Sequence, residues 1–397
     1  MLDLALQNEL REWQVDLSRL DAAADYVAQV TRNRFPALDP PMHSRWRHFV
    51  FGGRDLWEEH ASKVSWPNAA ARARAEFDLA IVSVLLDAGA GPAWKYHDAA
   101  TNTVATRSEG LALASLRWFM AGGLSSDPHE PLRVDAASLA RLDKHALHTA
   151  FQVSDANPLV GAEQRAALLN RLGSAMQSHP HKFGADGSAA TGSVRPGNLF
   201  DLLAARAPQQ RLPAAQILEA LLDSCGPIWQ NRPALDGVPL GDCWPHPALE
   251  ASAAGGDIAG RYAALHKLSQ WLSYSLIEPL QRAGLEVQSL QELTGLAEYR
   301  NGGLFTDMGV LVARDSSALS RSHSVAESFV IGWRSITVAL LDRLAPLVGD
   351  RLGLPNDSFL LARVLEGGTW AAGRQLAREK RGDGSPPFQI QSDGTVL

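Results

Sequence analysis

Apolar residues recur every three or four positions along most of the chain, the spacing that places them on one face of an α-helix. This pattern predicts long helices over Asn68 to Leu86, Arg261 to Ile277 and His323 to Val348. Pro279 is expected to stop the second helix, because proline lacks a backbone N–H and clashes with the preceding turn. No run of alternating apolar residues is long enough to predict a sheet, so the sequence indicates a mainly α fold.

The segment over residues 289–311 combines an expected helix with two carboxylates. Ser289 and Glu292 have the spacing of a capping box, so a helix is expected to begin there. Gly302-Gly303 is expected to end it, because glycine enters left-handed backbone conformations without a steric penalty. An ordinary surface helix carries similar charges, so a purely structural interpretation stays open. Two carboxylates flank the expected turn, Glu298 and Asp307.

The chain has 397 residues, which exceeds the usual size of one compact core. We expect two helical lobes, residues 1–155 and residues 156–397, with the acidic motifs in the second, or one intertwined domain. The 37 basic and 43 acidic residues give a net charge of −6. This balance provides no basic surface for nucleic acid or an anionic membrane, so a small polar substrate or a protein partner fits better.

Several features predict a reducing, cytoplasmic location. The two cysteines, Cys225 and Cys243, are too few for a disulfide framework or a zinc finger. The N-terminus carries acidic residues where a signal peptide needs basic and then apolar ones. The most apolar stretch, residues 77–94, falls short of the ~20 apolar residues that a membrane span requires. No cofactor is expected, and no metal site, because His179 and His181 lack carboxylates at ligand spacing.

The segment HSRWRHF, residues 43–49, interleaves basic and aromatic side chains. Arg45, Arg47 and His48 alternate with a tryptophan and a phenylalanine, a combination suited to stacking on a planar group and holding a phosphate. Arginine beside tryptophan is equally typical of surface packing. Both interpretations therefore stay open.

Eight segments occur in an order that resembles the bacterial and fungal uracil catabolism proteins, a family carried under a domain-of-unknown-function label. They span nearly the whole chain and are HSRWRHF, DAGAGPAWKY, SEGLALASL, SSDPHEPLRVDA, RPGNLFDLL, LGDCWPH, LTGLAEYRNGGLFTDMGVL and EGGTWAAGR. The resemblance implies a part in pyrimidine breakdown, in a pathway that recovers uracil nitrogen through a ribosylurea-type intermediate.

Three short motifs resemble, more distantly, the queuosine-nucleotide salvage glycosidases, which are helical proteins related to the helix-hairpin-helix DNA glycosylases. The motifs are Gly241-Asp242-Cys243-Trp244, Leu296-Ala297-Glu298-Tyr299-Arg300 and the segment from Glu327 to Arg334. The chain departs from that family at Glu298, where the family has aspartate, and in a longer spacing between the first two motifs. This resemblance implies a two-lobed helical fold and cleavage of an N-glycosidic bond.

Cleaving such a bond creates positive charge on the sugar, so the site needs a carboxylate near the anomeric carbon and help for the departing nitrogen. On the resemblance, we expect Glu298 to stabilise the cation or activate water, and Asp242 to hold sugar hydroxyls or share the base role. Asp307 is the third catalytic candidate, and all three carboxylates are expected in one cleft between the lobes. The expected substrate-binding residues are Arg45, Arg47, His48, Trp244, His246, Tyr299, Arg300, Glu327 and Arg334.

Several of these residues also have a structural interpretation. Trp244 and Tyr299 would either cover the planar leaving group or belong to the core. His246, between two prolines, is a candidate general acid or an incidental loop residue. Arg300 would pair with Glu327 or with a substrate phosphate, because an unpaired buried charge is strongly disfavoured.

The resulting hypothesis is a hydrolase that cleaves a ribosylurea-type nucleoside or its phosphate. Two alternatives stay open: a non-catalytic partner in a pyrimidine catabolic complex, and an amidohydrolase that acts on the opened ring. The expected partner is a small molecule derived from a nucleoside or nucleotide, with other uracil catabolism enzymes as further candidates. Neither nucleic acid nor a membrane is expected as a partner.

Overall fold

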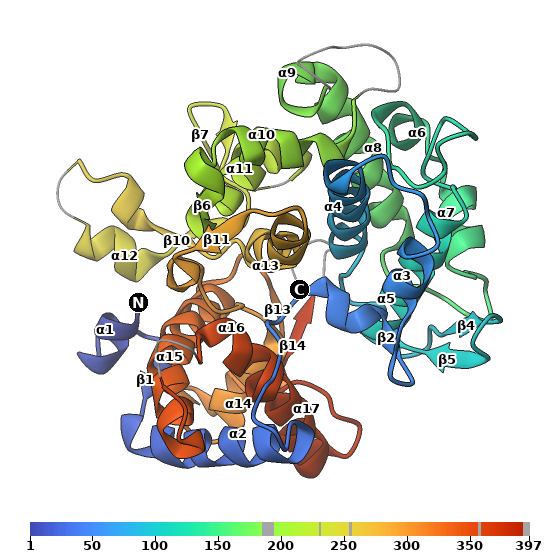
Figure 1. The fold of residues 1–397 in the computed structure, drawn as a ribbon. Helices are drawn as coiled ribbons and strands as arrows, with labels where there is room; N and C mark the ends of the chain where they lie inside the picture. The colour runs from blue at the N-terminus through green and yellow to red at the C-terminus, as the bar shows by residue number, and fades with distance from the viewer. Residues whose placement is uncertain (185–193, 230–231, 254–255, 356–358, 392–397) are drawn as a thin grey trace. The chain divides into compact units, whose positions relative to one another are not determined.

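The computed structural model describes residues 1–184, 194–229, 232–253, 256–355 and 359–391, and most of these residues are helical (Figure 1). The mainly α prediction is therefore confirmed. The chain forms two compact units: unit 1 consists of Met1–His43, Arg232–Gln270 and Gln291–Ser392, and unit 2 is built mainly from Ser44–Asn231 and Trp271–Leu290. The expected lobe boundary after residue 155 lies inside a segment of unit 2. Among the described residues, no helix combines the length and apolar character needed to cross a bilayer.

Unit 1 is built around α15 (Ser328–Leu352), a helix that is buried on most sides. The expected start at His323 is wrong, because His323 belongs to a short strand that precedes the helix. α2 (Leu20–Arg34) packs along α15, and α14 (Tyr299–Asp307) packs against both α15 and α17 (Trp370–Arg381). The other helices of unit 1 are α1 (Leu2–Leu6), α12 (Pro247–Ser252), α16 (Leu361–Val364) and a π-helical turn at Leu365–Thr369.

Short two-stranded ladders connect the loops of unit 1. Each strand has only two or three residues, which is too few for an alternating pattern to be recognised in the sequence. The antiparallel pairs are β1 (Trp13–Val15) with β12 (Leu311–Ala313), β9 (Cys243–Pro245) with β10 (Tyr262–Ala264), and β7 (Ala234–Leu235) with β8 (Val238–Pro239). The parallel pair is β13 (Ser322–Ser324) with β14 (Gln389–Gln391).

Unit 2 contains α4 (Ala69–Leu85), the helix predicted from residue 68. The Asn68 side chain accepts the backbone N–H of Ala71 at 2.8 Å, which caps the first turn. Phe77, Ile81, Val84 and Leu85 are all buried, as their spacing predicts. The other helices are α3 (Leu56–Ala61), α5 (Arg107–Met120), α6 (Ala136–Ala140), α7 (Lys144–Ala150), α8 (Ala162–Ser178), α9 (Pro180–Phe183), α10 (Leu199–Ala205) and α11 (Ala214–Cys225).

The strands of unit 2 are equally short. β2 (Val50–Phe51) pairs with β3 (Arg54–Asp55), and β4 (Tyr96–Asp98) pairs with β5 (Thr103–Ala105), both antiparallel. β6 (Arg211–Pro213) pairs in parallel with β11 (Glu286–Gln288).

α13 (Lys267–Arg282) continues through Pro279, so the expected stop at this residue is wrong. Proline has no N–H to donate to the carbonyl four residues earlier, which belongs to Ser275. That carbonyl accepts the indole N–H of Trp46 at 2.7 Å instead. The Trp46 side chain thus donates the hydrogen bond that Pro279 cannot donate. The expected start at Arg261 is also wrong, because β10 and a turn precede the helix.

α14 corrects the expectation for residues 289–311. The helix begins at Tyr299, whereas Ser289 has a φ of 55° and is followed by a 3₁₀ turn at Leu290–Glu292. Gly302-Gly303 lies inside α14 instead of ending it. A Cβ on Gly302 would overlap the ring of Trp333, so this glycine allows α14 and α15 to approach closely.

Candidate functional site

Glu298 occupies the N-cap position of α14 in unit 1. Its carboxylate accepts hydrogen bonds from the backbone N–H groups of Arg300, at 2.7 Å, and Asn301, at 2.6 Å. Glu298 is 6% exposed, and burial raises the pKa of its carboxyl group even though the two backbone hydrogen bonds favour the ionised form. A carboxylate has about four lone-pair sites, so the cap leaves part of its accepting capacity uncommitted.

Asp242 also lies in unit 1, directly before β9, and its lone pairs are fully used. It accepts hydrogen bonds from the Trp244 indole at 2.7 Å, from two nitrogens of Arg334 at 2.8 and 2.7 Å, and from the Lys267 backbone at 3.0 Å. Burial acts to raise its pKa, but the charge and hydrogen bonds of Arg334 outweigh burial and hold the pKa of Asp242 well below its ordinary value. Asp242 is therefore a permanent anion that is better suited to positioning its donors than to contacting a substrate.

Arg334 connects Asp242 to the start of α14. This fully buried side chain of α15 also donates its Nε to the carbonyl of Ala297, at 3.0 Å, the residue that precedes Glu298. Lys267 contributes a second positive charge, which acts to lower the pKa of Glu298 against the dominant effect of burial. The structure therefore brings Asp242 and Glu298 into one group of residues.

His266 belongs to the same group, although the sequence analysis did not single it out. Its backbone N–H donates to the backbone carbonyl of Asp242 at 3.0 Å, and its φ is 46°. His266 falls inside the helix expected from Arg261, and a left-handed conformation at histidine has no clear sequence signal. We call Asp242, Trp244, His266, Lys267, Glu298 and Arg334 the Glu298 cluster.

Asn301 adds a buried acceptor beside Glu298. Asn301 is 1% exposed, and its Nδ2 donates to the carbonyl of Leu296 at 3.3 Å. Its Oδ1 has no hydrogen-bond partner among the described residues. A buried acceptor without a partner is disfavoured, so this oxygen is a ready contact for a ligand N–H group.

Asp307 lies at the other end of α14 from Glu298. The nine residues of the helix separate the two carboxylates by about 13 Å along its axis. Asp307 is held by two nitrogens of Arg381, at 2.7 and 2.6 Å. The structure thus joins Asp242 with Glu298 and does not join Asp307 with them, contrary to the expected cleft of three carboxylates.

Arg300 and Glu327 have different partners from those expected. Arg300 donates to the carbonyl of Gly384 at 2.8 Å and lies over the ring of Tyr299. Glu327 contacts His323 Nδ1 at 2.7 Å and accepts the Ser324 backbone N–H at 2.6 Å. These bonds hold the loop before α15. Of the two partners considered for Arg300, Glu327 is bound elsewhere, and a substrate phosphate stays a prediction.

Trp244 and His246 take separate roles although they are close in sequence. Trp244 is buried, bonds to Asp242 and lies beneath the guanidinium of Arg232, 5.3 Å from its ring centre. His246 caps α12 by accepting the Ala248 N–H at 3.2 Å, and its Nε2 lies 4.0 Å from Glu12. Burial lowers the pKa of His246, while Glu12 opposes that change.

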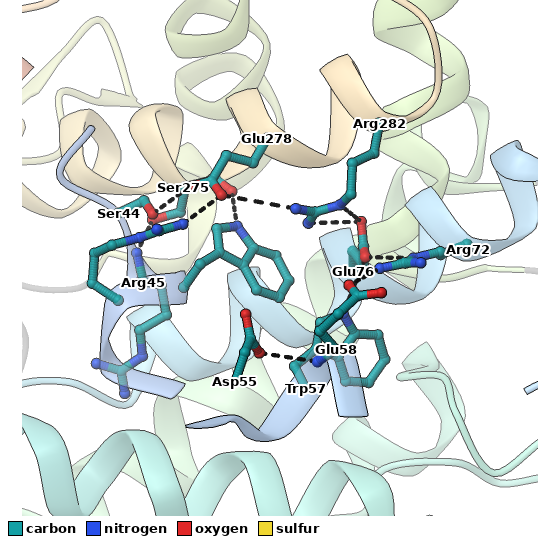
Figure 2. Close-up of polar contacts among 12 residues, drawn as sticks. Ser44, Arg45, Asp55, Trp57, Glu58, Arg72, Glu76, Ser275, Glu278 and Arg282 are labelled. Atoms are coloured by element: carbon teal, nitrogen blue, oxygen red, sulfur yellow. Dashed lines mark hydrogen bonds and ion pairs between the residues drawn. The ribbon is translucent and has the colours of Figure 1, made fainter. Parts of the chain in front are cut away.

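Arg45 and Arg47 lie in unit 2, and carboxylates neutralise both. Arg45 is fully buried, pairs with Asp87 and donates its Nε to Ser83 at 2.7 Å. Arg47 pairs with Glu278, whose carboxylate is drawn in Figure 2. Phosphate binding by these arginines therefore stays a prediction, with little uncompensated local charge to support it.

Figure 2 shows the polar network around Glu278, which the sequence analysis did not predict. Ser44 donates to Glu278 at 2.8 Å, and Arg282 lies 3.8 Å from the same carboxylate. Arg282 also binds the fully buried Glu76, at 3.0 Å. The indole of Trp57 donates to Glu76 at 3.0 Å. His48 contacts an aromatic side chain of unit 2, with its ring centre 5.6 Å from that of Trp271.

A cavity of about 280 Å³ opens in unit 1 at the start of α15. It contains Glu327 but neither Asp242 nor Glu298. Glu327 is seven residues before Arg334 on α15, or about 10 Å along the helix axis. The lining residues are Arg11, Glu12, Asp315, Ala318, Arg321, His323, Glu327, Ser328 and Phe329.

Comparison of the sequence with known proteins identifies the family of this chain. The model of the family described as "Protein of unknown function (DUF1688)" matches residues 1–397. The chain belongs to this family. The family expected from the eight sequence segments is thereby confirmed.

Two relatives of this DUF1688 protein match nearly end to end. Uracil catabolism protein 4 of Lachancea kluyveri is 35% identical over 416 residues, covering 97% of this chain and 92% of the relative. Protein urg3 of Schizosaccharomyces pombe is 35% identical over 408 residues, covering 100% of this chain and 95% of the relative. Both alignments cover 97% or more of the DUF1688 chain and therefore include both units.

Proposed function

We propose that this protein acts in uracil catabolism as a hydrolase that cleaves the N-glycosidic bond of a ribosylurea-type substrate, at the Glu298 cluster. The link to uracil catabolism rests on the relative named Uracil catabolism protein 4. The choice of reaction rests on the chemistry of the cluster. The resemblance to the salvage glycosidases stays a prediction that agrees with this choice.

The observation that carries the proposal is the pair of carboxylates with opposite pKa directions. Arg334 keeps Asp242 ionised, whereas burial raises the pKa of Glu298. Neighbouring carboxyl groups whose environments push their pKa values apart are typical of acid–base sites. Glu298 is the member with uncommitted lone pairs, so we assign it the reacting role and assign Asp242 a positioning role.

The reaction uses one water molecule. The bond between the sugar C1′ and the ureido nitrogen breaks, and its electron pair leaves with the nitrogen. Glu298 takes a proton from water, whose oxygen bonds to C1′, and that proton is finally delivered to the leaving nitrogen. The products are free ribose, or its phosphate, and urea. The negative charge of Glu298 also stabilises the cationic sugar in the transition state.

The indole N–H of Trp244 donates to Asp242 at 2.7 Å, and this bond orients the ring within the cluster. A planar ureido group suits packing against an aromatic side chain. Lys267 places a positive charge near Glu298, and a phosphorylated sugar would benefit from it.

The test is to incubate the pure protein with ribosylurea, its 5′-phosphate and uridine monophosphate, and to assay urea and free sugar. We expect urea from at least one of the first two compounds and none from the nucleotide. Release of ammonia without free sugar would instead identify an amidohydrolase. No product from any compound would leave the non-catalytic partner as the better account.

A further inference from the structure

His266 is held in place by the backbone of the Glu298 cluster. It follows β10 and directly precedes α13. Its N–H donates to the Asp242 carbonyl at 3.0 Å, and the next N–H, of Lys267, donates to the Asp242 side chain at 3.0 Å. Two consecutive backbone groups therefore fix the backbone of His266 relative to Asp242.

His266 combines an unfavourable backbone angle with a buried ring nitrogen that lacks a hydrogen-bond partner among the described residues. Its φ of 46° lies in the left-handed region, which residues with a Cβ rarely adopt. Its Nδ1 is buried and has no hydrogen-bond partner among the described residues. Strained residues and unsatisfied buried polar atoms concentrate where a ligand completes the contacts.

We propose that Nδ1–H of neutral His266 donates a hydrogen bond to the carbonyl oxygen of the substrate's ureido group and so assists its departure. The proposal rests on the hydrolysis proposed above. As the C1′–N bond breaks, its electron pair is shared between the leaving nitrogen and this oxygen. This oxygen therefore gains negative charge in the transition state, and a hydrogen bond donated to it becomes stronger there than in the ground state. Such differential stabilisation raises the rate.

The surroundings of His266 favour the neutral ring. Burial lowers the pKa of His266, and the nearby Arg334 acts in the same direction, while Asp242 opposes them. A neutral imidazole still has one N–H to donate. Arg334 and the indole of Trp244 already direct their donors at Asp242, so His266 is the side chain of the cluster whose described geometry leaves a ring nitrogen for the substrate.

The test compares His266→Gly with His266→Asn on ribosylurea and ribosylthiourea. Glycine fits the left-handed conformation, so the first variant removes the imidazole without strain. Asparagine also tolerates this conformation and offers an amide N–H near the position of Nδ1. Thiourea keeps the shape of the leaving group but replaces the carbonyl oxygen by sulfur, a weaker acceptor.

We expect His266→Gly to lower kcat on ribosylurea by about 100-fold, the scale of one aligned donor, and to change kcat on ribosylthiourea by less than about 5-fold. His266→Asn should recover part of the loss on ribosylurea. An equal loss on both substrates would show that His266 only maintains the fold and would overturn the proposal. Wild-type activity in His266→Gly would overturn it as well, while the proposed hydrolysis would stand.

Absence of urea release by the wild-type protein would instead contradict the proposed hydrolysis. The contact of His266 is then tested by nitrogen-15 NMR of the histidine rings during titration with ribosylurea, using His266→Gly to assign the signal. A shift of the His266 ring nitrogens supports the contact with the ureido group. Unchanged ring nitrogens at saturating ribosylurea overturn it.

Discussion

Arg334 binds Asp242 through two parallel hydrogen bonds, at 2.8 and 2.7 Å, although 92 residues separate them in sequence. Such paired bonds fix the plane of the guanidinium as well as its position. Because Nε of the same group reaches the Ala297 carbonyl, the orientation of Asp242 determines how the segment before Glu298 is held. We therefore regard this ion pair as the support of the proposed site.

Replacing Asp242→Asn should destabilise the protein by about 3–5 kcal/mol at pH 7, because Arg334 would be left buried without its counter-charge. Urea denaturation measures this difference. Asp201→Asn in unit 2 is the matched control, because Asp201 also accepts two hydrogen bonds from one arginine, from Nε and Nη2 of Arg74 at 2.7 Å, on a more exposed surface. The control should change stability by no more than about 1 kcal/mol.

The effect of Asp242 should also depend on pH. Its pKa is lowered from 3.8, so the native state holds the ionised form and the stabilisation is fully present above that value. As the pH falls below 3.8, the unfolded chain begins to bind a proton at Asp242 while the native carboxylate stays ionised, so the stabilisation declines and is lost once the native carboxylate is protonated as well. The difference in the free energy of unfolding between wild type and Asp242→Asn should therefore stay constant from pH 7 to about pH 5 and decrease below pH 4. A gap that widens on acidification would contradict the assignment.

Gly302→Ala and Gly303→Ala test whether α14 runs through both glycines. A Cβ on Gly302 would overlap the Trp333 ring, so alanine there should cost about 1–3 kcal/mol. A Cβ on Gly303 would lie 3.4 Å from Pro387, an ordinary contact, and alanine should be neutral or stabilise by up to about 1 kcal/mol through helix propensity. Thermal unfolding of both variants checks this. Equal destabilisation would indicate that the pair ends a helix after all.

The sequence was most informative where burial alone decides the structure. Phe77 and Ile81 predicted the buried face of α4, and Asn68 marked its start, because local spacing and capping suffice there. The helix predicted before α14 was wrong for the same reason: Leu290, Leu293 and Leu296 have helical spacing, but Leu293 and Leu296 are buried without a helix. Glutamate is also outside the residues usually favoured as N-caps, so Glu298 gave no start signal.

The candidate site was only partly predictable from sequence. Motif resemblance placed Asp242, Glu298 and Arg334 on the list of candidates, but their connection depends on contacts between distant segments. The roles of Asp307 and His246 were set by Arg381 and by the N-terminus of α12, which no local pattern indicates. His266 was missed because its importance lies in a backbone angle and an unsatisfied nitrogen.

The bond between Trp46 and the Ser275 carbonyl should be coupled to Pro279. Trp46→Phe leaves that carbonyl without its donor, which should cost about 1–3 kcal/mol beyond the packing loss. In a Pro279→Ala background, the new N–H of residue 279 lies four positions after Ser275 and can take the bond, so Trp46→Phe should cost less. Urea denaturation of the four proteins gives the coupling energy. Additive effects would show that the indole does not replace the missing helix bond.

Glu298 also caps α14, so a test of its catalytic role requires a control for helix capping. Glu298→Gln removes the charge while keeping one oxygen that can still accept a backbone N–H of α14. Asp135→Asn in unit 2 is the comparison, because Asp135 is a fully buried N-cap that accepts the N–H groups of Ser126 and Ser138, at 2.6 and 2.9 Å. Both variants should melt earlier than wild type, since each replaces one of the two accepting oxygens by an NH2 group and leaves a backbone N–H without its acceptor.

The deciding measurement is the single-turnover rate of urea release from ribosylurea, determined for both variants together with the melting temperature of the same preparations. We predict that Glu298→Gln slows urea release by about 100-fold or more per folded molecule, with a smaller change in substrate binding, and that Asp135→Asn keeps the wild-type rate. A Glu298→Gln protein that melts earlier but releases urea at the wild-type rate would contradict the catalytic assignment and leave Glu298 as a helix cap alone.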